Sequence, residues 1–266
     1  MEAAAGRRPH PGLLPAGRGR GLEREATGGR VTPRIALWLA VALCALLVLL
    51  PGIDLIVSGW FYAPGRGFAW DGAPLAEAFH EVVQVLVRTA AVLLLLAAGW
   101  TWWRQRRLLG LDARRWTFLA LALAIGPGLV ANAVLKDHWG RARPRQVEAF
   151  GGSATFTPPL IPAGQCSRNC SFVAGDPTVG FVVHSVAYVV PARRRRRIFW
   201  GSMTLGGLLG LLRIGMGGHF FSDVVFAAAV TLLVSAGLHA LLFDRWSTVA
   251  AWRDFTRGLI RWPEPR

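Results

Sequence analysis

Residues 116–144 read WTFLALALAIGPGLVANAVLKDHWGRARP, an uncharged run that ends at Leu135 and is followed by Lys136 and several arginines. A run of about 20 apolar residues at 1.5 Å per residue is long enough to cross a bilayer as a helix. The whole chain has the same character, with 53% apolar residues, 17% charged residues and a mean hydropathy of +0.39. The sequence therefore indicates an integral membrane protein.

Similar apolar runs lie on both sides of this stretch. They predict an all-α polytopic membrane protein with six transmembrane helices packed in one bundle. The fourth and fifth runs are short for a span, so their helices are expected to include part of the flanking loops or to lie inside the bundle. In chain order the six runs are Ile35–Ile56, Val82–Trp103, Trp116–Leu135, Thr178–Pro191, Ile198–Leu212 and Val224–Phe243.

The ends of the chain differ from the apolar region in composition. Residues 1–34 are rich in Gly, Pro and Ala, hold seven arginines and lack an apolar period, which predicts a disordered cytoplasmic tail. We expect one membrane domain over 35–243 and a second cytoplasmic tail over 244–266.

Arginine next to the membrane ends predicts the orientation. With six spans, the arginine-rich segments 1–34, 104–115 and 193–197 all fall on one side, and cytoplasmic loops are the ones enriched in arginine and lysine. The segments 136–177 and 213–223 then face outward, so the unusual polar residues of the chain gather at one face.

Lys136 is the only lysine, whereas the other 29 basic residues are arginine. Lysine is a compact point charge and arginine a planar fork, so together they suit a phosphoryl group with three oxygens. Arg143 precedes Pro144, which restricts its backbone to an extended conformation and fixes the direction of its side chain. Lys136, Arg143 and Arg213 are the candidate phosphate ligands, while Arg141 and Arg145 are interpreted as ordinary interfacial arginines.

His219 and Asp223 are four residues apart. On a helical turn the carboxylate of Asp223 would hold one ring nitrogen and leave the other free as a nucleophile. The alternative is a hydrogen bond at a helix start without catalysis.

Cys166 and Cys170 lie in the long outward loop, where an oxidising compartment permits a disulfide. A disulfide is the favoured prediction, and two free thiols are the alternative. A metal site is not expected, because the sequence nearby shows no third and fourth ligand.

These motifs resemble the type 2 phosphatidic acid phosphatase superfamily of membrane lipid phosphatases and phosphotransferases. Its signature has three parts: Lys-x6-Arg-Pro, Pro-Ser-Gly-His and Ser-Arg-x5-His-x3-Asp. The first part matches at Lys136 and Arg143, and the third at Arg213, His219 and Asp223, although Leu212 replaces the serine. The resemblance implies that the three cations bind phosphate, that His219 attacks phosphorus to form a phosphohistidine, and that Asp223 orients it.

The middle part departs from the signature. Residues 173–176 read Val-Ala-Gly-Asp, so only Gly175 is retained and Asp176 stands where the family has its histidine acid. Two interpretations of Asp176 compete: it protonates the leaving oxygen, or it is the N-cap of the fourth helix with Pro177 at the first helical position. The segments around Asn169 and Arg213 look similar to the branch that includes lipid A 1-phosphatases.

The expected function is metal-independent hydrolysis of a phosphate group from a membrane lipid, at the outer, periplasmic face of a bacterial inner membrane. The candidate substrates are lipid A, undecaprenyl diphosphate, phosphatidylglycerol phosphate and phosphatidic acid. No cofactor and no nucleic-acid partner are expected. The alternatives are a lipid-to-lipid phosphotransferase and a non-catalytic phospholipid-binding membrane protein.

Overall fold

The structure, a computed structural model, describes residues 33–243, with side chains described from residue 41 on. The predicted tails fall outside the described residues, except that Pro33 and Arg34 already belong to the first helix. In chain order the elements are α1 (Pro33–Leu49), α2 (Gly52–Gly59), β1 (Tyr62–Ala63), β2 (Gly67–Phe68), α3 (Pro74–Arg104), α4 (Ala113–Leu123), η1 (Ala124–Lys136), η2 (Pro144–Gln146), η3 (Glu148–Phe150), α5 (Gly175–Val182), η4 (Val183–Ser185), α6 (Val186–Val189), α7 (Ala192–Gly215) and α8 (Phe221–Phe243).

The described part is mainly helical, as predicted, and its two strands form a small antiparallel hairpin in which Tyr62 pairs with Phe68. Helix α4 continues into η1, a wider π-type helix, so that one span runs over Ala113–Lys136. Pro127 lies inside η1 and has no N–H to donate, and the side chain of Asn132 donates to the carbonyl of Pro127 at 2.7 Å. Wide turns of this kind occur often near functional sites, and Lys136 is the last residue of this one.

Six spans are not confirmed among the described residues. Four helices are long and apolar enough to cross a membrane, namely α3, the continuous α4–η1 helix, α7 and α8. A fifth span results if α1 and α2 are counted as one pair, which is bent by 93°. The predicted fourth helix is present as α5, η4 and α6, but these cover only residues 175–189, fewer than the about 20 residues a straight span needs.

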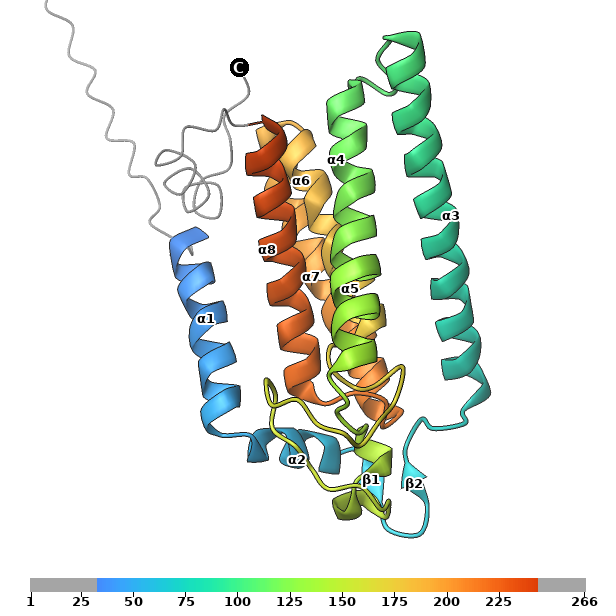
Figure 1. Cartoon of the computed structure of the whole chain (residues 1–266), viewed down its shortest axis with the longest axis vertical. Helices are drawn as coiled ribbons and strands as arrows, with labels where there is room; N and C mark the ends of the chain where they lie inside the picture. The colour runs from blue at the N-terminus through green and yellow to red at the C-terminus, as the bar shows by residue number, and fades with distance from the viewer. Residues whose placement is uncertain (1–32, 244–266) are drawn as a thin grey trace, which may run out of the picture. The chain divides into compact units, whose positions relative to one another are not determined.

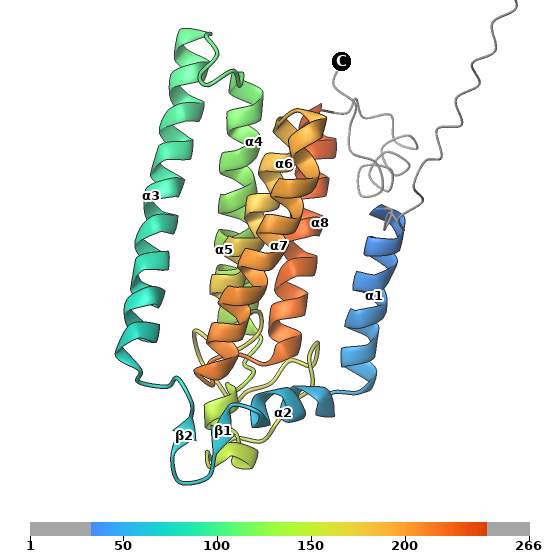
Figure 2. The ribbon, with the colours of Figure 1, turned by 180° about the vertical axis from the view of Figure 1, so that it is seen from behind.

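The helices run alongside one another, and their connections separate into two ends (Figure 1). The link between α3 and α4 and the start of α7 lie at one end, which holds the arginine-rich segments 104–115 and 193–197. Helix α2, the β1–β2 hairpin and the long loop after η1 lie at the other end. Viewed from behind, α5 and α6 return the chain from this loop end to the arginine-rich end (Figure 2).

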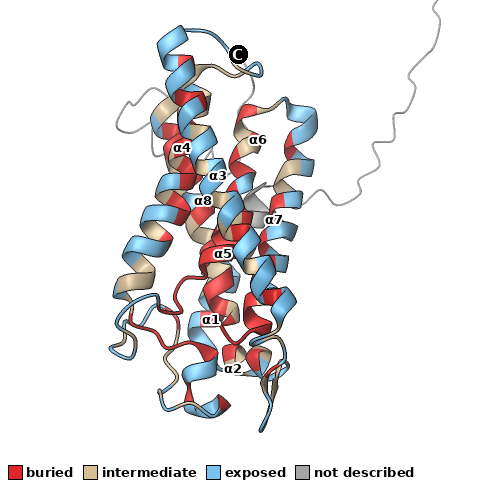
Figure 3. Cartoon of the chain, turned by 90° about the vertical axis from the view of Figure 1, so that its right-hand side faces the viewer, coloured by how far each residue is buried: buried red, intermediate tan, exposed pale blue. Residues whose placement is uncertain are grey.

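Burial is uneven across the helices. Helix α5 is almost entirely buried, whereas α3 is mostly exposed along its length (Figure 3). An exposed apolar helix in a membrane protein faces lipid. Helices α5 and α7 approach very closely, because a Cβ atom on Gly180 would lie 2.6 Å from the Cα atom of Gly206. These two glycines fix the distance between the two helices that carry Asp176 and Arg213.

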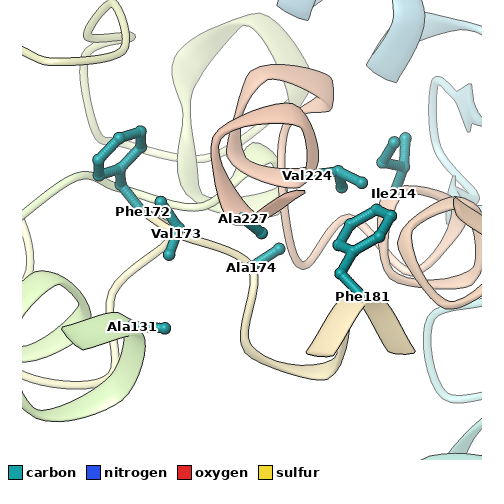
Figure 4. Close-up of a cluster of buried hydrophobic side chains, with 8 residues drawn as sticks. All are labelled: Ala131, Phe172, Val173, Ala174, Phe181, Ile214, Val224 and Ala227. Atoms are coloured by element: carbon teal, nitrogen blue, oxygen red, sulfur yellow. The ribbon is translucent and has the colours of Figure 1, made fainter. Parts of the chain in front are cut away.

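A core of apolar side chains lies directly behind the loop end. It joins the segment before α5 to η1, α7 and α8, and it gives the long loop a rigid support (Figure 4). Its members are Ala131, Phe172, Val173, Ala174, Phe181, Ile214, Val224 and Ala227.

Candidate active site

A cavity of about 720 Å³ opens between α3, the α4–η1 helix, α5 and α7. Six of the seven residues predicted for catalysis and phosphate binding line it. They are Lys136, Arg143, Gly175, Asp176, Arg213 and His219. The seventh, Asp223, is fully buried behind His219.

Three different elements deliver the three cations. Lys136 ends η1 and Arg213 lies in the last turn of α7. Arg143 has the extended backbone expected before Pro144, and its Nη2 donates to the carbonyl of Asn169 at 2.7 Å. Burial, together with the positive charges of Arg213 and Arg145, lowers the pKa of Arg143 to about 10, so it stays charged at neutral pH. The cavity therefore carries concentrated positive charge.

Arg213 keeps a donor available. Its buried Nε has no hydrogen-bond partner among the described residues and lies 3.4 Å from a carboxylate oxygen of Asp176. Unpaired buried donors are costly unless a ligand supplies an acceptor. A phosphoryl oxygen is such an acceptor.

Gly175 allows Lys136 to approach the backbone of α5. A Cβ atom at position 175 would come within 2.9 Å of Nζ of Lys136 and 3.1 Å of the side-chain oxygen of Asn132. Any larger residue would push the ammonium group away, which explains why position 175 is a glycine.

His219 lies in the loop between α7 and α8 and does not take the partner that its spacing predicts. Its Nδ1 lies 2.7 Å from the main-chain carbonyl oxygen of Ser171 but 3.8 Å from the carboxylate of Asp223. Nδ1–H therefore donates to the carbonyl of Ser171, and Nε2 keeps its lone pair. The ring is oriented for nucleophilic attack through Nε2, with Asp223 as a nearby charge rather than the hydrogen-bond acceptor.

Asp223 instead braces the start of α8. It accepts hydrogen bonds from the hydroxyl of Ser171 and from the main-chain N–H of Phe220, the latter at 2.8 Å. The bond to Phe220 is the N3-to-N-cap half of a capping box. Since Ser171 also supplies the acceptor for His219, Asp223 holds that acceptor in place.

The sequence-based interpretation of Arg141 is wrong. Arg141 is not an interfacial arginine but fully buried, and its Nη1 lies 2.6 Å from Asp223 and its Nη2 2.8 Å from Asp54 of α2. Asp54 in turn accepts from the main-chain N–H of Ser222 at 2.8 Å. This buried network, consisting of Asp54, Arg141, Ser222 and Asp223, ties α2 and the long loop to α8.

Asp176 is neither a cap nor a free acid. Helix α5 begins one residue earlier, at Gly175, and its N-cap residue Ala174 makes no side-chain cap bond, so the capping interpretation is wrong. One oxygen of Asp176 lies 2.6 Å from Nδ1 of His80, and the other accepts from Nε2 of Gln84 at 2.8 Å. These partners, all on α3 apart from Arg213, are what an ionised carboxylate binds.

The loop before α5 is closed by a disulfide between Cys166 and Cys170. Directly beside it, the N–H of Cys170 donates to the carbonyl of Lys136 and the N–H of Ser171 to that of Arg141, both at 2.9 Å. The disulfide-closed loop thus presents the carbonyl of Ser171 to His219 on a braced segment.

Residues 115–247 match the PAP2 superfamily, and this range contains both matching signature parts and every cavity residue from Lys136 to His219. The chain belongs to the PAP2 superfamily. It is thus a membrane lipid phosphatase of the PAP2 type.

Three curated relatives of this PAP2 phosphatase share one name, lipid A 4'-phosphatase. The protein from Rhizobium leguminosarum is 32% identical over 77% of this chain and 93% of its own length. The protein from Rhizobium etli is 30% identical over 77% and 84%. The protein from Francisella tularensis subsp. novicida is 45% identical over 48% of this chain, and the match spans only 58% of that relative. No solved structure matches significantly.

The predicted proximity to lipid A 1-phosphatases is not supported, because the relatives carry the 4' name. That prediction rested only on the short segments around Asn169 and Arg213.

Sequence reasoning also missed residues that lie outside the matched range, namely Asp54, His80 and Gln84. A signal was present for each. Asp54 is an acid inside an apolar run, and His80 and Gln84 are polar residues four apart at the start of a membrane-spanning helix, where such residues usually face a partner.

The protonation of His219 leads to a pH prediction for the PAP2 phosphatase. Burial lowers the pKa of His219 to about 4, and the charges of Lys136 and Arg213 act in the same direction, against Asp223. Protonation removes the lone pair of Nε2, so a lowered pKa keeps this lone pair available at lower pH. We expect kcat/KM, corrected for the ionisation of the substrate phosphate near about pH 6, to stay level down to about pH 5 and fall tenfold per pH unit only below about pH 4.

The control for this profile is the stability of the protein over the same pH range, measured by recovery of activity after return to pH 7. An acid limb near the ordinary histidine value of about 6.5 would contradict the buried, neutral His219.

Proposed function

We propose that this PAP2 phosphatase removes a phosphate group from a phosphorylated membrane lipid through a phosphohistidine at His219. The arrangement that carries the proposal is one cavity in which Lys136, Arg143 and Arg213 surround His219, whose Nε2 keeps its lone pair. The cations bind the phosphoryl oxygens and stabilise the charge that develops on them in the transition state.

The reaction proceeds in two displacements. Nε2 of His219 attacks phosphorus, the bond to the lipid oxygen breaks, and phosphate remains on the histidine. Water then attacks the phosphohistidine, the P–N bond breaks, and inorganic phosphate leaves. Asp223 acts as a positioning residue, because its carboxylate holds Ser171, which in turn holds His219. The negative charge of the phosphate is balanced by the side chains of Lys136, Arg143 and Arg213.

We propose lipid A as the substrate, with the 4'-phosphate as the group removed. The name shared by the relatives supports this choice, above all the relative that matches over 93% of its length. The cavity suits an ester whose lipid part stays in the membrane, since its lining includes Leu95, Ala91 and Val87 of the lipid-facing helix α3.

We also propose that the site faces the periplasm from the inner membrane. The arginine-rich segments 104–115 and 193–197 lie at the end of the bundle opposite the site (Figure 1). Cytoplasmic ends carry such residues, so the site end is the outer one.

The test is phosphate release by the detergent-purified protein from lipid A, undecaprenyl diphosphate, phosphatidylglycerol phosphate and phosphatidic acid. We expect the highest kcat/KM on lipid A, with mass spectrometry finding the 4'-phosphate removed and the 1-phosphate intact. Fast release from another lipid would overturn lipid A as the substrate, whereas the proposed reaction would stand. No release from any of the four, with the lipids still bound, would favour a non-catalytic binding protein.

A further inference from the structure

We propose that His80 of α3 is the general acid that protonates the leaving oxygen, and that Asp176 is its positioning residue. The inference rests on the proposed function and adds to it a catalytic residue from a helix outside the matched range 115–247. Three observations carry it: the contacts of Asp176, the place of His80 in the cavity, and the chemistry of the leaving group.

Asp176 has no proton to give. Its two oxygens lie 2.6 Å from Nδ1 of His80, 2.8 Å from Nε2 of Gln84 and 3.4 Å from Nε of Arg213. The nitrogens of Gln84 and Arg213 can only donate hydrogen bonds. A protonated carboxyl would point its hydrogen at one of these groups rather than at a substrate. The carboxylate is therefore occupied on both oxygens, and another group in the cavity must supply the proton.

His80 is placed to do so. Its ring lines the same cavity as His219, and 26% of its side chain is exposed. Because Nδ1 is directed at Asp176, the second ring nitrogen, Nε2, is left for a substrate, and no hydrogen bond from the described residues reaches it. The carboxylate fixes the direction of the ring, as a carboxylate does for a catalytic histidine in general.

The acid is needed because of what leaves. A sugar or alkyl alkoxide is a poor leaving group, and proton transfer by a positioned side chain typically contributes about 10²- to 10⁴-fold to such a step. As Nε2 of His219 bonds to phosphorus, the P–O bond to the lipid breaks and its oxygen takes the proton from Nε2 of protonated His80. In the second step neutral His80 takes a proton from the attacking water. Its charge is thereby restored, and the lipid alcohol and phosphate are the products.

A purely structural role for the same contact is the competing interpretation. His80 and Gln84 join the outer end of α3 to α5, and losing that junction would loosen the cavity. A loosened cavity slows every substrate alike, whereas a missing acid slows only substrates whose leaving group needs a proton. The dependence on the leaving group separates the two roles.

The experiment measures kcat/KM of the full-length protein for p-nitrophenyl phosphate, phenyl phosphate and benzyl phosphate, which have similar size and increasingly basic leaving groups. His80→Gln keeps an amide that can still donate to Asp176. We expect it to lower kcat/KM by about 10²-fold or more for benzyl phosphate and by less than about threefold for p-nitrophenyl phosphate. Activity on the latter also reports that the variant has folded.

Gln84→Leu is the matched control, since it removes a donor to the same carboxylate and leaves the imidazole. It should change kcat/KM by one factor for all three esters. Asp176→Asn, a second route to the same question, should reproduce the leaving-group dependence of His80→Gln at smaller amplitude. A uniform loss in both His80→Gln and Asp176→Asn, or no loss, would overturn the assignment of the acid.

The proposed function fails separately. If the wild-type protein releases phosphate from none of the esters or lipids, or if His219→Gln retains its rate, the phosphohistidine mechanism and the role of His80 both fall. If the wild type turns over and depends on His219, but the His80 variant shows no leaving-group dependence, only the role of His80 falls.

Discussion

His219→Gln is expected to abolish phosphate release, with a loss in kcat of about 10⁴-fold or more, the scale seen when a covalent nucleophile is removed. Glutamine retains a donor for the carbonyl of Ser171, 2.7 Å from Nδ1 in the wild type, but it has no nucleophilic nitrogen. The measurement is phosphate release from lipid A, together with trapping of labelled phosphate on the protein at alkaline pH, where a phosphohistidine survives.

His138→Gln is the matched control. His138 is an exposed histidine at the same end of the bundle, whose Nδ1 contacts the carbonyl of Val134, and it does not line the cavity. Turnover and trapping should be unchanged in this variant. Label retained by His219→Gln would identify a different nucleophile and contradict the proposed mechanism.

Arg141→Met is expected to have the largest effect on stability. It removes a guanidinium that is fully buried between Asp54 and Asp223, at 2.8 Å and 2.6 Å, and leaves two buried carboxylates without a countercharge. Breaking a buried pair in this way costs about 3–5 kcal/mol. The measurement is the free energy of unfolding in mixed micelles by titration with a denaturing detergent.

Arg145→Met provides the comparison. Arg145 pairs with Asp71 at 3.0 Å, but both side chains are 41% exposed, and exposed pairs contribute about 0–1 kcal/mol. If Arg141→Met were no less stable than Arg145→Met, the buried network would not be what anchors α2 and the long loop to α8.

The two arginines also mark how far the sequence could be interpreted. Arg141, Arg143 and Arg145 alternate along one short segment, and only Arg143 has a neighbour, Pro144, that constrains its backbone. Arg141 is buried against Asp54, which is 87 residues away in sequence, whereas Arg145 pairs with Asp71 and stays exposed. No local pattern encodes that pairing, so it appears only once the helices are packed.

Spacing within a segment was more informative than composition. Lys136, Arg143, Arg213 and His219, which were singled out by their spacing, line one cavity, and each interval lies across a helix end and its adjoining turn. The role of Asp176 was not predictable, because its partners come from α3 and a helical pattern does not tell which neighbour a polar residue will contact. The prediction of six spans is not confirmed, because α5, η4 and α6 cover only residues 175–189 and are largely buried, as the short fourth apolar run had indicated.

The hydrogen-bond acceptor of His219 determines which missense mutations can disturb its ring. The atom that accepts the Nδ1 proton is the carbonyl oxygen of Ser171, which belongs to the main chain. Every amino acid carries that oxygen, so no missense mutation of Ser171 can remove it. A single substitution, by contrast, removes the carboxylate of Asp176 or of Asp223. A mutation of Ser171 therefore cannot remove the acceptor that sets the tautomer of His219, and other mutations can change this contact only through the residues that shape the loop.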